Sequence, residues 1–333
     1  MTSLVLALCI FASFFNASND NETSVGSASG ASLADFLLKV PAKWNVEPQA
    51  GKADLQYIAP RGWAQTEVNG ERTLKKFNED HKVFNLVVLP TRPLNGSLRD
   101  TFAQLWNMYI GSEFATTIAP LPMMTRLKSG YACAFDVDDG AKFKNGVHFR
   151  AALYLIAQGG MVTPVVGMFA IYDTKVEGEL EGFFESARIP GASTAKVKLF
   201  AASDIAGDWA RSSSSFADYV TSTGAYAGDA SIAVAQSFDL SATGSYKHIQ
   251  VVLAQGRRFS DTDAGAWSLD DNDLVLKHNP TERYVVFGYG SAPKLGRFLV
   301  LSDYSDRING ATGSKIEFSR PRSSPGTEWF HAK

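Results

Sequence analysis

The sequence predicts an α+β domain with an antiparallel sheet and covering helices, followed by an all-β antiparallel barrel. Up to residue 191, apolar residues recur with both a period of two and a helical period. Residues 190–198, PGASTAKVK, are small and polar, as in a linker. Beyond residue 203, short strand-like runs follow one another with Gly, Asp and Asn between them. That order of elements is typical of an α+β unit joined to a barrel or sandwich.

Length and charge limit the class of protein. The chain has 333 residues, of which 45% are hydrophobic and 20% are charged, and this favours two globular domains. The formal net charge is −2, and no long basic run occurs. We therefore expect no nucleic-acid partner, because a nearly balanced chain lacks the positive field that holds a phosphate backbone.

The first residues have the composition of a secretory leader. An apolar core covers residues 4–15, which is too short for a transmembrane helix but suits a signal peptide. We predict a signal peptide over 1–18, a disordered tether over 19–32, and a secreted or periplasmic protein with no integral membrane segment after leader removal. No Lys or Arg precedes Lys39, so the usual positive region is missing. The alternative to a signal peptide is a misassigned or disordered N-terminus.

Cysteine usage excludes one kind of stabilisation. Cys9 lies in the leader, which leaves Cys133 as a single thiol without a disulfide partner in the mature chain. Both domains must therefore rest on their hydrophobic cores.

The first domain is expected over 33–191. Its best helix follows Ser97, where Ser97 and Asp100 match a capping box and Gly111 ends the apolar stripe. A second helix is predicted over 176–187. Strands are predicted over 55–63 with a break at Pro60, over 83–90, over 131–137 as a half-buried strand, and on both sides of a turn at Gln158-Gly159-Gly160. We expect the helices to cover one face of the sheet.

One loose motif in this domain resembles a known family. Tyr57, Pro60, Gly62 and Trp63, with the order strand, long helix, strands, closing helix, are similar to the PsbP/DcrB-like fold over about residues 50–190. The resemblance implies a small secreted or envelope-associated accessory domain. It implies no catalytic residues, because that family has no common catalytic set.

The second domain is expected over 203–321, after a linker over 192–202, with a tail over 322–333. Its predicted strands are 207–212, 232–240, 245–253, 266–269, 273–277, 283–289, 297–301 and 315–318. Asp270 to Asn272 supply the turn of a clear hairpin.

Several short motifs of this domain resemble small lipocalin-like proteins. The strand series opens on Gly207-Asp208-Trp209, and TGSYK and GAWSLDDNDLVLKH repeat a Gly-x-aromatic pattern. Ser302-Asp303-Tyr304 with Arg307 is similar to a lipocalin loop. The resemblance implies a calyx in which Trp209 plugs the closed end, and it specifies no ligand.

Aromatic residues on the predicted strands are the candidate ligand-binding residues of the barrel interior or mouth. They are Trp209, Tyr246, Trp267, Tyr284 and Phe287. The alternative is that they only fill the core. Because Ala233 and Ala235 are small but most candidates are large, we expect a mostly filled barrel with a shallow mouth pocket.

The sequence contains no motif for metal binding or catalysis. None of the five histidines has zinc-ligand spacing, and the acidic groups Asp136 to Asp139 and Asp270 to Asp273 lack EF-hand spacing. We interpret them as solvated turns. No nucleophile elbow or phosphate-binding loop occurs. We therefore predict no catalytic residues, no metal and no cofactor.

The leader and the absence of a catalytic motif favour a secreted, non-catalytic binding or accessory protein, and the PsbP/DcrB-like resemblance implies a bacterial-type envelope or exterior. Its partner would be an envelope protein or a small apolar ligand. Two alternatives stay open: a carrier of a small apolar ligand in the barrel, and an enzyme whose site is assembled from distant residues.

Overall fold

The structure is a computed structural model. It describes residues 55–68, 71–77, 83–116, 120–142, 148–169, 174–220, 226–254, 256–278, 281–292, 296–303 and 328–332. The predicted leader and tether lie outside these residues. No helix in the described part of the chain is long and apolar enough to cross a membrane.

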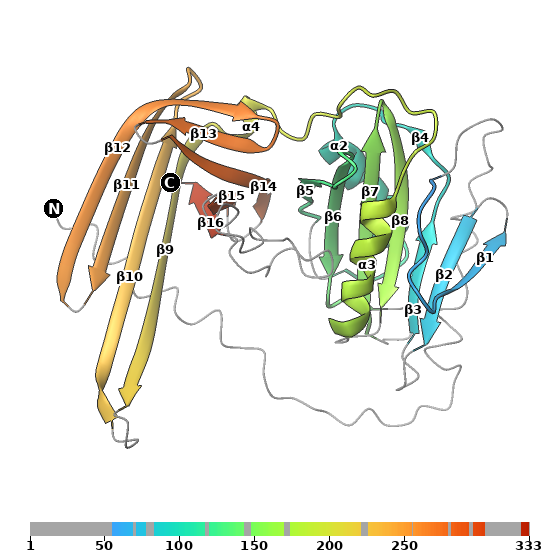
Figure 1. Cartoon of the computed structure of the whole chain (residues 1–333), viewed down its shortest axis with the longest axis horizontal. Helices are drawn as coiled ribbons and strands as arrows, with labels where there is room; N and C mark the ends of the chain where they lie inside the picture. The colour runs from blue at the N-terminus through green and yellow to red at the C-terminus, as the bar shows by residue number, and fades with distance from the viewer. Residues whose placement is uncertain are drawn as a thin grey trace. The chain divides into compact units, whose positions relative to one another are not determined.

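The first domain contains an antiparallel sheet (Figure 1). Its strands lie in the order β1-β2-β3-β8-β7-β6-β5, with β4 paired to β8. Their bounds are β1 Ala64–Val68, β2 Glu71–Phe77, β3 Val83–Val88, β4 Arg92–Pro93, β5 Met123–Arg126, β6 Ala132–Asp138, β7 Arg150–Gln158 and β8 Met161–Phe169. The predicted turn at Gly159-Gly160 joins β7 to β8, and both glycines have positive φ angles, as a tight hairpin requires.

Helices lie on both faces of this sheet, so the expectation of one covered face is wrong. Helix α2 (Leu98–Trp106) and the π-helical turn η2 (Asn107–Gly111) pack with Ala132 and Ala134 of β6. Helix α3 (Thr174–Ser186) packs with Cys133 and Phe135 on the opposite face.

The double cover explains a second difference. Strand β6 was predicted to be half-buried, but every residue from Ala132 to Asp138 is buried. Asp136 and Asp138 also lie inside rather than in a solvated turn. The carboxylate of Asp136 accepts a hydrogen bond from the Leu121 backbone N–H at 2.7 Å, and that of Asp138 accepts one from the Gly140 N–H at 2.8 Å.

The predicted capping of the first helix is partly seen. The Ser97 side chain accepts a hydrogen bond from the Asp100 backbone N–H at 3.0 Å, which satisfies one of the unpaired donors of the first turn. Residues 55–63, predicted as a broken strand, contribute only an isolated bridge between Gln56 and Arg188.

The second domain is a closed eight-stranded antiparallel barrel in the order β10-β11-β12-β13-β14-β15-β16-β9. It follows a short helix, α4 (Ala202–Ile205). The strand bounds are β9 Gly207–Val220, β10 Tyr226–Leu240, β11 Ser245–Ala254, β12 Arg257–Asp270, β13 Asp273–Lys277, β14 Glu282–Ala292, β15 Gly296–Asp303 and β16 Glu328–Ala332.

Seven of these strands coincide with predicted ones. The predicted strand at 315–318 lies outside the described residues. The closing strand is β16, which falls within the residues 322–333 expected to form a tail. It is held on one side by β15 and on the other by β9.

The barrel wall is not of even height. Strands β9 to β12 run for 10 to 15 residues, whereas β13 and β16 have 5 residues each. In the described chain, β13 pairs with β12 only over Ala266–Asp270, and β16 pairs with β9 only at Trp209 and Ala210. The long strands therefore continue past the closed wall (Figure 1). We call this part, which includes 211–220 of β9 and 257–265 of β12, the open extension.

Candidate functional site

The inner face of the barrel can be followed row by row because side chains alternate along each strand. Near the closed wall, the inward rings form an aromatic collar, defined as Trp209, Phe238, Trp267, Tyr284 and Phe330. All five are buried. Phe238 is the centre of the collar, with ring centroids 5.5 Å from Tyr284 and 5.2 Å from Phe330. The collar fills this end of the barrel.

Trp209 lies where the resemblance to lipocalin-like proteins implies a plug. Its side chain is 1% exposed, and its indole N–H donates a hydrogen bond to the Ile205 carbonyl at 2.8 Å. A buried Trp thus has both its apolar ring covered and its single donor satisfied.

The other candidate residues divide between two clusters. Tyr246, Trp267 and Tyr284 lie in the interior cluster with Trp209. Phe287 lies at a bulge in β14 and packs in a separate cluster with Phe298 and Val300. Ala233 and Ala235 alternate with Val234 and Gln236, and the latter two share the inward face of Phe238. The small side chains of Ala233 and Ala235 therefore add no space inside the barrel, in keeping with the expected filled interior.

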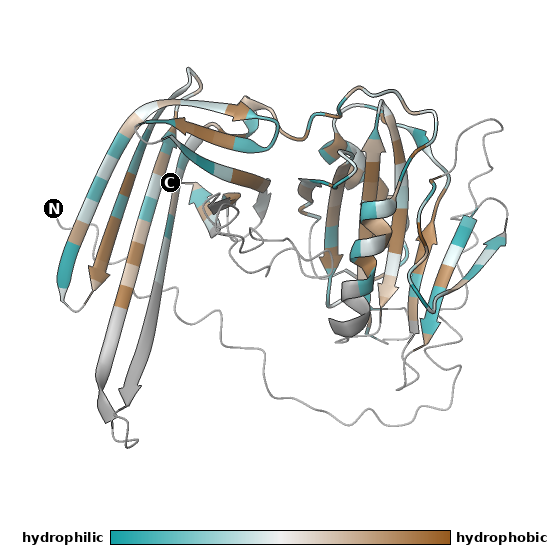
Figure 2. Ribbon diagram, in the orientation of Figure 1, coloured by the Kyte–Doolittle hydropathy of each residue, from teal (hydrophilic) through white to brown (hydrophobic). Residues whose placement is uncertain are grey.

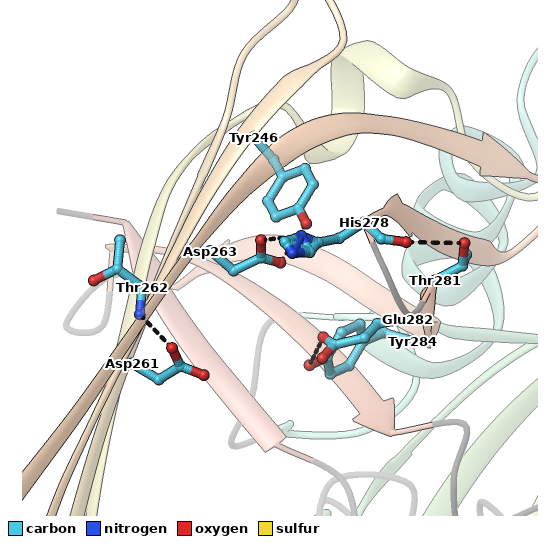
Figure 3. A network of polar contacts seen from close by, with 8 residues as sticks. All are labelled: Tyr246, Asp261, Thr262, Asp263, His278, Thr281, Glu282 and Tyr284. Atoms are coloured by element: carbon cyan, nitrogen blue, oxygen red, sulfur yellow. Dashed lines mark hydrogen bonds and ion pairs between the residues drawn. The ribbon is translucent and has the colours of Figure 1, made fainter.

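Inward-facing polar side chains follow the aromatic collar at the level where the closed wall of the barrel ends. Phe238, His248 and Asp263 lie directly opposite one another on β10, β11 and β12. The Tyr246 hydroxyl donates a hydrogen bond to one oxygen of Asp263, and His278 Nδ1 lies 2.6 Å from the other (Figure 3). We define Tyr246, His248, Asp263, His278 and Glu282 as the inner polar cluster.

A glycine makes this arrangement possible. Gly265 lies opposite Tyr246, and a Cβ atom there would approach the Lys277 carbonyl oxygen to 2.7 Å and the Tyr246 ring to 3.0 Å. Any larger residue would displace the ring that carries the hydroxyl to Asp263. The close approach of two strands and a ring therefore requires Gly.

His248 is the unusual member of the cluster. The residue is only 8% exposed, its ring stacks on Phe238 with centroids 4.3 Å apart, and its Nε2 atom has no hydrogen-bond partner among the described residues. Burial lowers the pKa of His248, against the opposing field of Glu282, Asp263 and Asp261. The imidazole is therefore held neutral, with a buried polar nitrogen left over.

Several charged groups act on the pKa of this imidazole. The Tyr284 hydroxyl donates to Glu282 at 3.2 Å, and Asp261 lies one inward position beyond Asp263 on β12 (Figure 3). Arg211 is the opposing cation, and it donates to the Gln236 side chain at 2.7 Å and lies over the Phe330 ring. Burial, followed by the hydrogen bond to Asp263, raises the pKa of Tyr246, so its hydroxyl keeps its proton.

Two kinds of chemistry find little support in this geometry. Among the described residues, no group of three or more His, Cys, Asp or Glu side chains could hold a metal ion. The pair of Asp263 and His278 has the form of an oriented base, but within the described chain no hydroxyl or thiol is hydrogen-bonded to the His278 ring. The inner polar cluster has polar groups that could bind a ligand.

Sequence reasoning missed His248, Asp263, His278 and Glu282 as site residues. His248 lies in the predicted strand 245–253 and His278 directly follows the predicted strand 273–277, but their separation of 30 residues carries no signal. Only the register of β10, β11 and β12 brings Phe238, His248 and Asp263 into one row.

A hollow of about 450 Å³ lies away from the barrel interior. It is lined by the start of helix α2, including Ser97 and Leu98, and by the segment from Ala195 to Ala201. Its two lysines, Lys196 and Lys198, lie on this same segment.

Comparison with known proteins returned little. No family model matches the chain, and no curated protein matches it. The solution structure of cyanobacterial PsbP (CyanoP) from Synechocystis sp. PCC 6803 has a similarity that covers 42% of this chain and 95% of the CyanoP chain. The two sequences are 14% identical, and the TM-score is 0.29. Values this low imply neither a shared activity nor a shared partner.

Proposed function

We propose that this chain is a non-catalytic binding protein of the exterior or envelope, and that the inner polar cluster is where it binds a small ligand. The apolar leader supports the location, since it has the length and composition of a signal-peptide core. The inward rows of the barrel support the binding role.

One observation carries the proposal: His248 Nε2 is buried and has no hydrogen-bond partner in the part of the chain that the structure describes. A buried polar atom without a hydrogen bond costs about 1–3 kcal/mol, so native proteins retain few of them. Here His248 lies in a row with Asp263, whose carboxylate is 2.6 Å from Nδ1 of the partly exposed His278. A ligand that donates to Nε2 would satisfy it, and the neighbouring carboxylate would orient that donor.

The cluster also separates this proposal from a carrier of purely apolar ligands. Tyr246, Asp263 and Glu282 would all have to be desolvated under an apolar molecule, and buried polar groups without new partners oppose binding. A ligand with at least one polar group fits the inner face better.

The test uses three aromatic probes of similar size and different charge: phenethylamine, 3-phenylpropan-1-ol and 3-phenylpropionate. Ligand-detected NMR and calorimetry on the full chain should show saturable one-to-one binding of at least one probe. His248→Phe keeps the ring stacked on Phe238 but removes Nε2, so it should weaken that binding tenfold or more.

Asp239→Asn is the matched control, because Asp239 is exposed and alternates to the outer face of β10. It should leave binding unchanged. If no probe binds, or if His248→Phe binds every probe as tightly as the parent chain, the proposed function is wrong.

A further inference from the structure

The charge around His248 is predominantly negative. Glu282, Asp263 and Asp261 all act on the imidazole, and Arg211 is the one cation among the groups that do so. Arg211 already donates to Gln236 and lies over a ring of the collar. The field on the inner face therefore favours a positively charged group over a neutral or negative one.

The neutral imidazole adds directionality to this field. Because burial keeps His248 neutral, one of its two ring nitrogens carries a lone pair, and in the tautomer protonated at Nδ1 that nitrogen is the unpartnered Nε2. A carboxylate or phosphate ligand could not use a lone pair. An ammonium group could donate one N–H to Nε2 and another to the Asp263 or Glu282 carboxylate.

The rings beside the cluster have the right chemistry for the same group. Phe238 and Tyr284 are buried, and their ring centroids lie 5.5 Å apart at 75°. The face of an aromatic ring attracts a cation by about 0.5–2 kcal/mol, depending on desolvation. An ammonium group at His248 would thus lie near carboxylates and near the aromatic rings of the collar.

Farther along the open extension, the inward face becomes apolar again. Val234, Val252 and Phe259 lie opposite one another on β10, β11 and β12, and Ile232 occupies the next inward position on β10. Phe259 is 57% exposed and Ile232 is 45% exposed. This row lies four residues from the row of His248, or roughly 13 Å at the rise of a strand. Large apolar side chains this exposed are typical of a surface that covers an apolar ligand.

We propose that the ligand is an amphiphilic organic cation, whose ammonium head lies among His248, Asp263 and Glu282 and whose apolar tail lies along Val234, Val252 and Phe259. This inference rests on the proposed function and adds the chemical class of the ligand. The proposal assigns the ammonium head to the polar row and the tail to the apolar row. A ligand of this class therefore accounts for both rows on the same inward face.

The experiment compares three eight-carbon probes on the full chain by calorimetry below their micelle concentrations: octylamine, 1-octanol and octanoate. Octylamine should bind at least tenfold more tightly than octanol, and octanoate more weakly still. Asp263→Asn and Glu282→Gln should each remove most of the preference for the amine over the alcohol. Asp239→Asn, on the outer face, should preserve it.

The tail is tested by chain length. From hexylamine to decylamine, affinity should rise about twofold to fourfold for each added methylene, as expected for partial to full burial of a CH₂ group. Phe259→Ser should flatten this series. Phe259 is exposed, so the substitution leaves the fold intact.

The outcomes separate the inference from the proposed function. If octanol binds as tightly as octylamine or more tightly, the proposal that the ligand is a cation is wrong. Tighter binding of octanoate also overturns it, and would indicate a reversed ligand with its carboxylate at the exposed Arg257. If the phenyl probes bind at His248 and the alkylamines do not, the inference fails and the proposed function stands. If neither set binds, both fail.

Discussion

Strands β9 to β12 carry buried inward side chains at one end and exposed inward side chains at the other. At the closed end, neighbouring strands β13 and β16 complete the wall, and inward side chains such as Trp209 and Phe238 are less than 2% exposed. In the open extension, the same inward face carries Ile232 and Phe259, which are largely exposed. The closed end provides stability, and the open end provides an accessible surface.

The inner polar cluster lies at the boundary between these ends. Buried polar groups inside a filled core would cost free energy, whereas the same groups in open solvent would bind only weakly. At the boundary, His248 is buried while His278 and Glu282 stay accessible. The contrast with the first domain is visible in Figure 2, where β7 and β8 are mainly hydrophobic and β12 is mixed.

The largest expected effect tests the closed end. Trp209→Ala should lower the free energy of unfolding by about 3–5 kcal/mol, because it empties the space of a buried Trp and leaves the Ile205 carbonyl without its indole donor. Urea unfolding of the full chain, followed by circular dichroism, measures it.

Phe259→Ala is the comparison from the open end, and it should change the free energy of unfolding by less than about 0.5 kcal/mol, since an exposed side chain loses little on truncation. Equal effects of the two substitutions would show that the two ends do not differ as described.

The next effect tests the close approach at the boundary. Gly265→Ala should destabilise the chain by about 1–3 kcal/mol, because the added Cβ would overlap the Lys277 carbonyl and press on Tyr246. Gly182→Ala is the control in helix α3, where nothing lies within 4 Å of the added atom and Ala is the better helix former. Thermal unfolding should show a loss for the first variant and no loss for the second.

Much of this fold follows from local pattern. Alternation of apolar and polar residues located seven of the barrel strands, and the Gly-x-Trp motif located the buried Trp209. Both signals come from neighbours in the chain, which is why they survive in the structure. The helix after Ser97 was predicted for the same reason, through its cap and apolar stripe.

Contacts between distant segments could not be predicted. Strand β6 looked half-buried because one face carries small and acidic residues, but α2 and α3 cover both faces. The closing strand β16 is only five residues long and lies in the segment that was expected to form a tail. The site depends on register, since a shift of β12 by one residue would turn Asp263 to the outer face.

The smallest expected effect is the contribution of His248 to the pH dependence of stability. His248 has its pKa lowered by burial, so the unfolded chain binds a proton at His248 more readily than the folded chain. Above the ordinary pKa of about 6.5, His248 is neutral in both states and contributes no pH dependence. As the pH falls below that value, the unfolded state gains the proton first, and the folded state becomes less stable by this contribution. Glu282, Asp263, Asp261 and Arg211 are the charged groups that face the imidazole, and they stay in place in the variant.

His248→Phe removes the titrating group while keeping a ring against Phe238. Between pH 7 and pH 5, its thermal midpoint should therefore fall less than that of the parent chain. His148→Gln, at an exposed histidine in the first domain, should follow the parent profile. If the His248→Phe variant loses as much stability on acidification as the parent chain, the imidazole is not held neutral by burial. Below about pH 6.5 the ring would then be mainly protonated in the folded chain and would lose the acceptor on which the binding site depends, since a protonated ring offers no lone pair to an ammonium group.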